Sequence, residues 1–122
     1  MLNQVQLIGR LGNEPEVRTT ASGDKVANFS VATTETWMKD GERKSKTTWI
    51  RIEAWGNGTV NAIEKYLVKG SLVFVQGSLK ITEGEKDGVK VNYVSVKVSG
   101  AGSEVKFLDR KGQEEREPGQ EG

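Results

Sequence analysis

The chain has no cysteine and no histidine among its 122 residues. Without cysteine it forms no disulfide and no thiolate metal site. Without histidine it lacks the most common general base, the most common zinc ligand and every Ser-His or Cys-His nucleophile arrangement. No pair of carboxylates stands in a setting that favours catalysis in their place. We therefore predict a protein that is not an enzyme and that uses no metal and no cofactor.

Proline and long apolar segments are also scarce. The two prolines stand against 15 glycines, which is typical of a β domain with many turns and bends. No apolar run is long enough to cross a membrane, and residues 1–4 do not begin a secretory signal. The net charge of +1 argues against a duplex binder that relies on many phosphate contacts. It argues less against a protein that relies on stacking.

Residues 47–55, TTWIRIEAW, are rich in aromatic and β-branched side chains and predict a strand. Alternation places Ile50, Ile52 and Ala54 on an ordinary core face. The opposite face carries Trp49, Arg51, Glu53 and Trp55. Tryptophan beside arginine on an open sheet face suits the stacking of nucleobases and the binding of phosphates. The alternative is that these tryptophans pack under a loop or in a subunit interface.

The rest of the chain predicts a small barrel. We expect five main strands at 5–11, 25–36, 47–55, 71–81 and 89–99, with one helix at 59–68. A short continuation of the first strand is expected at 17–20, and a last short strand at 104–108. Val60, Ile63 and Leu67 have helical spacing, and the helix is expected to plug one barrel end. Three strands, one helix and two strands is the order of the OB-fold, an all-β, five-stranded Greek-key barrel with the helix between strands 3 and 4. An immunoglobulin-like sandwich would leave the helix unexplained.

Two charged segments are predicted as loops. Residues 39–46 are basic and lie between Trp37 and Trp49, so we expect a flexible loop that wraps around a nucleic-acid strand. The alternative is that they form only the solvated tip of a hairpin. Residues 82–88 are expected to be a charged hairpin loop. On the flanking strands, we expect Val73, Val75, Leu79, Ile81, Val94, Val96 and Val98 to face inward, and Phe74, Lys80, Tyr93, Ser95 and Lys97 to face outward.

The domain boundary follows from composition. Residues 1–109 form the predicted OB-fold domain, and residues 110–122 are charged, contain no apolar residue and are expected to be disordered.

Eight sequence blocks occur in order: NQV at 3–5, IGRLG at 8–12, PEVR at 15–18, VANFSVAT at 26–33, ETW at 35–37, TWIR at 48–51, YLVKGS at 66–71 and VQGSL at 75–79. Together they resemble the bacterial-type single-stranded DNA-binding protein over about residues 3–108. The resemblance implies an OB-fold, a homotetramer, and binding of single-stranded DNA without sequence preference in replication, recombination and repair. It also implies a cytoplasmic, nucleoid-associated protein, with an organelle or a phage-infected cell as alternatives.

The resemblance also assigns stacking residues. Trp37 and Trp49 match the stacking tryptophans of that family, and Trp55 lies where it usually has phenylalanine. Its further aromatic between strands 4 and 5 has no match, since residues 82–88 contain none. The candidate nucleic-acid-binding residues are Trp37, Trp49, Trp55, Phe74, Arg10, Arg18, Lys39, Arg43, Lys44, Lys46, Arg51, Lys69 and Lys80.

The family typically ends in an acidic tip that closes with Pro-Phe and recruits replication and repair proteins. This sequence ends in QEG at 120–122, so such recruitment is not expected. The sequence is either shortened or a variant from a phage, plasmid or organelle. Two other functions stay open: an OB-fold module for RNA binding or protein assembly, and a carboxylate-dependent nuclease on the same fold.

Overall fold

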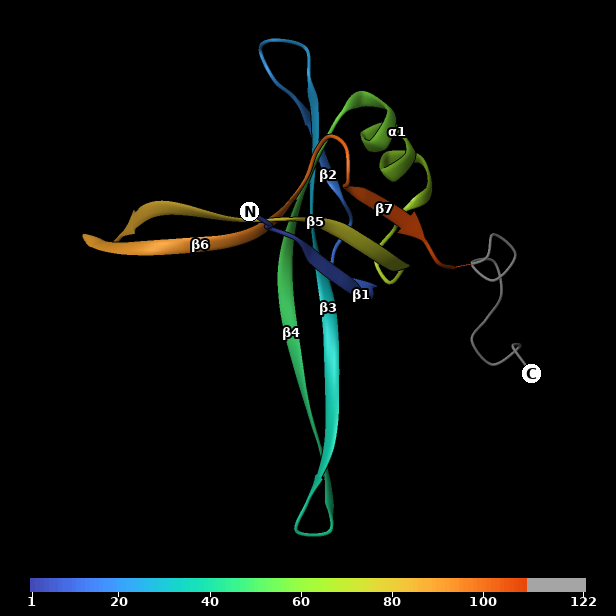
Figure 1. The fold of residues 1–122 in the computed structure, drawn as a ribbon, viewed down its shortest axis with the longest axis vertical. Coiled ribbons are helices and arrows are strands. Elements are labelled where there is room, and N and C mark those ends of the chain that lie inside the picture. Colours follow the sequence, from blue (N-terminus) through green and yellow to red (C-terminus); the bar gives the residue numbers. More distant parts are fainter. Residues whose placement is uncertain (110–122) are drawn as a thin grey trace.

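The structure is a computed structural model, and it describes residues 1–109 (Figure 1). The predicted tail at 110–122 lies outside the described residues. In chain order the elements are β1 (Val5–Leu11), β2 (Glu16–Thr19), β3 (Lys25–Lys39), β4 (Glu42–Trp55), α1 (Asn57–Tyr66), β5 (Leu72–Lys86), β6 (Val89–Val98) and β7 (Glu104–Phe107).

Five strands close into a barrel, which confirms the predicted OB-fold. The ring runs β1–β3–β4–β6–β5 and returns to β1, and each pairing is antiparallel except β4 with β6. The short strands β2 and β7 pair with β3 and β5 outside the ring. Since β2 is a separate strand, the helix lies between β4 and β5, which are the third and fourth barrel strands. Closure leaves no unpaired edge in the ring.

The core consists of the inward side chains that alternation predicted. Ile52 and Ala54 of β4 are fully buried, as are Val73 and Val75 of β5. Complete burial of an aliphatic side chain of this size contributes about 1.5–3 kcal/mol. The same alternation turns Trp49 and Arg51 outward, so the core fixes which face of β4 is free.

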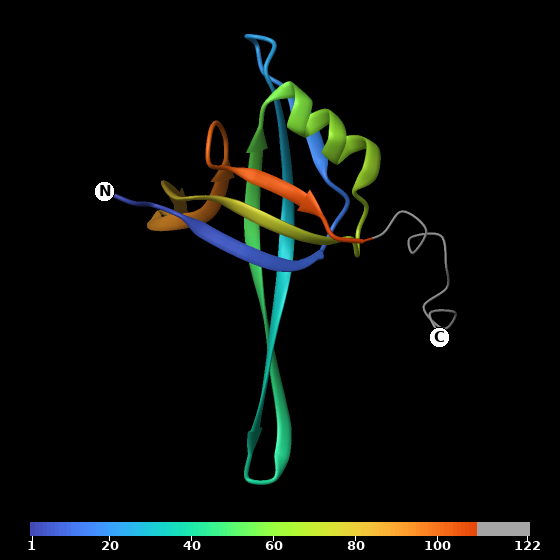
Figure 2. The ribbon, with the colours of Figure 1, turned by 45° about the vertical axis from the view of Figure 1, so that its right-hand side comes forward.

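The helix joins this core. Val60, Ile63 and Leu67 are buried in the core cluster, as their spacing predicted. The helix begins at Asn57, directly after Gly56 with φ +106°, and so starts two residues before the predicted range of 59–68. Figure 2 shows the helix, in green, at one end of the barrel next to strand β7, in orange. A tilted contact between the rings of Tyr66 and Phe107, with centroids 5.9 Å apart, joins the two elements.

Two long hairpin arms project from the barrel, and here the predicted loops were wrong (Figure 1). Strands β3 and β4 stay paired as far as Lys39 and Glu42. Asp40 and Gly41 between them have φ +52° and +79°, as a type I′ turn requires. Asp87 and Gly88 close β5 and β6 in the same way. Most side chains near both tips are exposed on both faces, so no hydrophobic alternation marked these strands.

Part of the predicted inward set was also wrong. Leu79, Ile81 and Val94 are exposed, because the β5–β6 arm carries them beyond the barrel interior. Val96 is buried at the root of the arm, as predicted. Ser95 lies on the outward face, as expected, but it is buried there where β6 pairs with β4. Alternation therefore predicted the faces correctly only where the barrel closes over them.

Candidate nucleic-acid interface

The outward face of the sheet is organised in cross-strand rows. One row runs Glu16, Asn28, Glu53 and Lys97 across β2, β3, β4 and β6. The next runs Ser30, Arg51, Ser95 and Lys80 across β3, β4, β6 and β5. Side chains in neighbouring rows on one face lie within reach of each other. The rows therefore make a continuous polar surface across five strands.

This surface is hollowed. Two adjoining hollows of about 330 and 210 Å³ share Glu16, Asn28 and Arg51 as lining residues. We call them together the sheet-face groove, lined by Asn13, Glu16, Asn28, Phe29, Ser30, Arg51, Glu53, Thr82, Tyr93 and Ser95. The Asn13 side-chain oxygen accepts hydrogen bonds from the Ser30 backbone N–H (2.9 Å) and hydroxyl (2.8 Å), and so fixes the β1–β2 turn against β3.

Trp49 borders the groove beside the row of Ser30 and Arg51. It pairs with Ala32 of β3, and 62% of its surface is exposed. Its ring lies over Gly12, where a Cβ atom would overlap the ring and would also meet the Ser30 hydroxyl at 3.0 Å. The missing side chain at Gly12 therefore provides the space in which the ring lies. A broad, exposed, positioned indole of this kind can stack a base.

Trp55 borders the other side of the groove and is half-buried. Its indole N–H donates a hydrogen bond to the Glu53 carboxylate. The ammonium of Lys97 lies 5.9 Å from the centre of its ring, at the outer range of a cation–π contact. A further hollow of about 340 Å³ lies beside Trp55 and is lined by Asp24, Gly56, Lys97 and Ser99 as well. The two tryptophans of β4 thus flank a polar groove on one face.

The carboxylate of Glu53 is held in the groove by contacts with Trp55 and Lys80. Lys80 Nζ lies 3.3 and 3.2 Å from its two carboxylate oxygens. Burial alone would raise the pKa of Glu53, but hydrogen bonds from Trp55 and Lys80, with the charges of Lys80 and Lys97, outweigh it and lower that pKa. The carboxylate is therefore ionised at neutral pH, inside a surface that also carries Arg51.

Tyr93 is a groove residue that the sequence did not single out. It was expected to face outward, and it does, with 44% of its surface exposed. Its ring lies over Gly84 of the paired strand, where a Cβ would come within 2.6 Å of Cε2. The signal was an aromatic on an outward strand position. Its place near Arg51 depends on the parallel pairing of Arg51 with Ser95, which sequence alternation does not predict.

Trp37 and most of the basic arm residues lie away from the groove. Trp37 pairs with Lys44 near the tip of the β3–β4 arm, and Glu35 pairs with Lys46. By alternation these side chains and Lys39 lie on the face opposite to Trp49, whereas Arg43 lies on the same face as Trp49. Lys44 is paired with Glu42 at 3.0 Å. The arm therefore presents two different basic faces.

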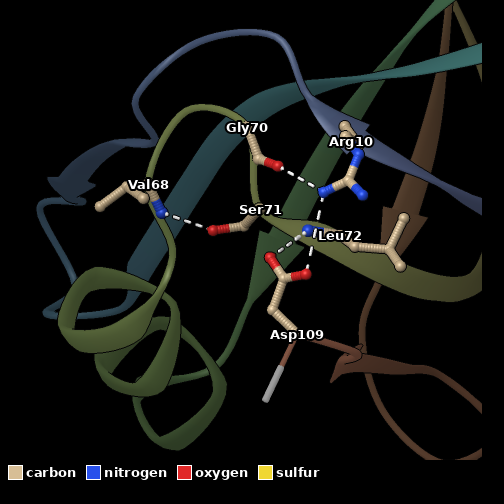
Figure 3. A network of polar contacts seen from close by, with 6 residues as sticks. All are labelled: Arg10, Val68, Gly70, Ser71, Leu72 and Asp109. Atoms are coloured by element: carbon tan, nitrogen blue, oxygen red, sulfur yellow. Dashed lines mark hydrogen bonds and ion pairs between the residues drawn. The ribbon is translucent and has the colours of Figure 1, made fainter. Parts of the chain in front are cut away.

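Arg10 belongs to a separate polar cluster at the start of β5 (Figure 3). Its guanidinium donates to the Gly70 carbonyl at 3.0 Å and lies 3.8 Å from the Asp109 carboxylate. Asp109 also accepts a hydrogen bond from the Leu72 backbone N–H at 2.9 Å. Val68 N–H donates to the Ser71 hydroxyl at 3.1 Å in the same turn. Arg10 thus ties β1 to the segment after the helix and to the end of the described chain.

The remaining candidates are divided between the groove and other surfaces. Arg18 lies on the same face of β2 as Glu16 and is exposed, so it extends the groove edge. Phe74 pairs with Ile8 of β1 and Lys106 of β7, which puts it on a different side of the barrel. Lys69 lies in the exposed turn after the helix, where its backbone N–H donates to Glu14. Of the thirteen candidates, Trp49, Trp55, Arg51, Lys80 and Arg18 are gathered at or beside the groove.

Comparison with known proteins identifies the family. The model of the single-strand binding protein family matches residues 2–108, which include the whole barrel and the groove. The chain belongs to the single-strand binding protein family. Membership agrees with the resemblance seen in the sequence and with the observed OB-fold.

Relatives in this family align over most of the chain. The single-stranded DNA-binding protein of Rickettsia felis is 40% identical over 114 residues, covering 90% of this chain and 74% of that protein. The protein of the same name from Rhizobium meliloti is 34% identical over 116 residues, covering 93% and 67%. A solved structure of Plasmodium falciparum SSB in complex with ssDNA superposes with a TM-score of 0.83 at 41% identity, covering 89% and 96%.

Among residues 1–109, no group of three or more His, Cys, Asp or Glu side chains is placed to hold a metal ion. Within that same part of the chain, no helix has the length and apolarity needed to span a membrane.

Proposed function

We propose that this chain binds single-stranded DNA without sequence preference and protects it in replication, recombination and repair. One observation carries the proposal: Trp49 and Trp55 face the same way on β4 and flank a polar groove that contains Arg51. The solved relative described as a complex with ssDNA supports the same ligand. A protein that only binds and covers single-stranded DNA needs no catalytic residue and no cofactor.

Stacking supplies sequence-independent affinity. Each base that stacks on an aromatic ring contributes about 1–3 kcal/mol, and every base has a π-face. Trp49 and Trp55 are the first two platforms, and Tyr93 on the β5–β6 arm is a third. The bases of a duplex are already stacked on one another, so their faces cannot reach these rings. The groove therefore favours single strands over duplex.

Phosphate contacts are assigned to the exposed cations around the groove. Arg51 lines both hollows, and Arg18 and Arg43 lie on the same outward face. The bound DNA is proposed to continue along the β3–β4 arm, on the face opposite to Trp49. The residues assigned to that path are Trp37, Lys39, Lys44 and Lys46. Arg10 and Phe74 are left out of the proposed interface, because their contacts lie on other parts of the barrel.

We further propose that the chain works as a homotetramer. Leu79, Ile81 and Val94 are exposed on a strand face that continues the barrel core. Adjacent apolar side chains of this size on a surface favour burial by another subunit. Four linked grooves raise the affinity for a long strand through effective concentration. Light scattering after gel filtration tests this: four times the chain mass is expected, and a monomer at micromolar concentration contradicts it.

Tryptophan fluorescence tests the ligand directly. The chain is titrated with oligo(dT), with oligo(U) RNA and with a matched DNA duplex, at low and at high salt. Strong quenching by oligo(dT) and little by duplex is the expected result, since the indoles stack on unpaired bases. Equal affinity for RNA would favour an RNA-binding module. No quenching and no affinity for any nucleic acid would favour a protein-assembly module, with the groove face covered by protein.

A further inference from the structure

A fixed negative charge in a groove proposed to bind a polyanion requires an explanation. Glu53 lies on β4 between Arg51 and Trp55, on the same outward face, and only 15% of its side chain is exposed. It is therefore no solvated surface acid that could turn away from a bound strand. Its carboxylate stays in the groove, between the two tryptophans that flank it.

The contacts of Glu53 restrict two neighbours. The carboxylate accepts the indole N–H of Trp55, which fixes the rotation of that ring. It also accepts Lys80 Nζ at 3.2 and 3.3 Å, so this ammonium is held in the groove wall. Lys97 lies next to Glu53 in the β4–β6 register and above the Trp55 ring. One carboxylate thus binds a stacking residue and neutralises a cation.

We propose that Glu53 is a positioning residue that reserves the centre of the groove for a base and excludes a phosphate from it. It does so by holding the Trp55 indole in place and by keeping Lys80 paired. The inference rests on the proposed binding of single-stranded DNA. It differs from the simple expectation that Lys80 contacts a phosphate.

The physical reason lies in the balance of charges. A phosphate placed near Lys80 would face the Glu53 carboxylate at similar distance, so attraction and repulsion largely cancel. A base has no net charge, and it gains the stacking energy of an indole that is already oriented. Orientation before binding reduces the entropy lost on association. The phosphates are therefore directed to Arg51 and the exposed cations at the groove edges.

Salt dependence distinguishes these two uses of Lys80. For single strands the slope of log K against log salt falls by about 0.7 for each phosphate that a cation neutralises. Glu53→Gln removes the charge but keeps an oxygen that can accept the Trp55 N–H. It releases Lys80, so oligo(dT) should bind several-fold more tightly at low salt, with a slope steeper by about 0.7. Lys80→Gln in the wild-type chain should leave the slope unchanged, and in the Glu53→Gln chain it should remove the added slope.

Two further variants separate the parts of the proposal. Glu16→Gln is the matched control, because Glu16 lines the same hollow and forms no ion pair within residues 1–109. Its substitution removes a negative charge from the groove but releases no cation, so any gain in affinity should come without a steeper slope. Glu53→Ala frees Lys80 but also removes the acceptor for Trp55, so it should bind more weakly than Glu53→Gln. Circular dichroism checks that each variant is folded.

The outcomes are decisive in either direction. An unchanged slope in Glu53→Gln, or a flatter slope in Lys80→Gln alone, would overturn the proposal, because Lys80 would then already contact phosphate. If the slope became equally steep in Glu16→Gln, the effect would come from general charge repulsion in the groove, and the proposal would also be overturned. A wild-type chain that binds no single strand at low salt would refute the proposed function, and this inference with it. Binding with an unchanged slope refutes the inference alone.

Discussion

Replacing Trp49 by alanine should separate binding from folding. Because 62% of Trp49 is exposed, only about two-fifths of an aromatic surface of about 250 Å² is buried on folding. At about 25 cal/mol per Å², its removal costs about 2.4 kcal/mol of stability, which a domain of typical stability tolerates. The loss of one stacked base costs about 1–3 kcal/mol of binding, which weakens affinity about 5- to 150-fold.

The assay is an anisotropy titration with labelled oligo(dT), together with far-UV circular dichroism and thermal unfolding. Tyr66→Ala is the matched control, because Tyr66 is 46% exposed but rests on Phe107 beside the helix, away from the groove. It should lower the stability by a similar amount and leave the affinity unchanged. The reasoning is refuted if Trp49→Ala unfolds the domain, or if Tyr66→Ala weakens binding as much.

Three further predictions follow from the described contacts. Gly12→Ala places a Cβ in the space of the Trp49 ring, so it should weaken oligo(dT) binding with little change in Tm; unchanged affinity would argue against this ring position. Ile52→Ala empties a fully buried site and should lower the free energy of unfolding in urea by about 2–5 kcal/mol, whereas a loss under about 1 kcal/mol would show that the site collapses. Folding lowers the pKa of Glu53, so its stabilising effect is complete above the ordinary carboxyl pKa and is lost as the pH falls through the lowered pKa. The urea midpoint of Glu53→Gln should therefore fall less steeply on acidification than that of the wild type, and identical pH profiles would contradict this.

Local pattern was sufficient for the barrel and for the outward placement of the β4 residues in the candidate site. The alternation of Ile50, Ile52 and Ala54 with Trp49 and Arg51 predicted correctly which side chains leave the core. The single helix followed from Val60, Ile63 and Leu67 in the same way. These signals work because one face of each element packs against the core and the other face does not.

The rest of the site depends on pairings between distant segments. The parallel pairing of β6 with β4 brings Tyr93 to the groove and Lys97 to the Trp55 ring, and the contact of Lys80 with Glu53 crosses from β5 to β4. No local period encodes such a register. The arms were missed for another reason: near their tips both faces are exposed, so strand and loop have the same polar composition. Each tip contains an Asp-Gly step, which is a local signal for the turn alone and not for the length of the paired strands.

The two arms also set how stability is distributed along the chain. Each is a two-stranded ladder with buried side chains at its root and exposed ones at its tip. Opening the pairs near Asp40 or Asp87 exposes little apolar surface other than part of Trp37, whereas opening the root disrupts the core. Amide hydrogen exchange should therefore slow progressively from tip to root. A bound strand can bend an arm tip at little cost in free energy, while the tryptophans at the root keep their positions.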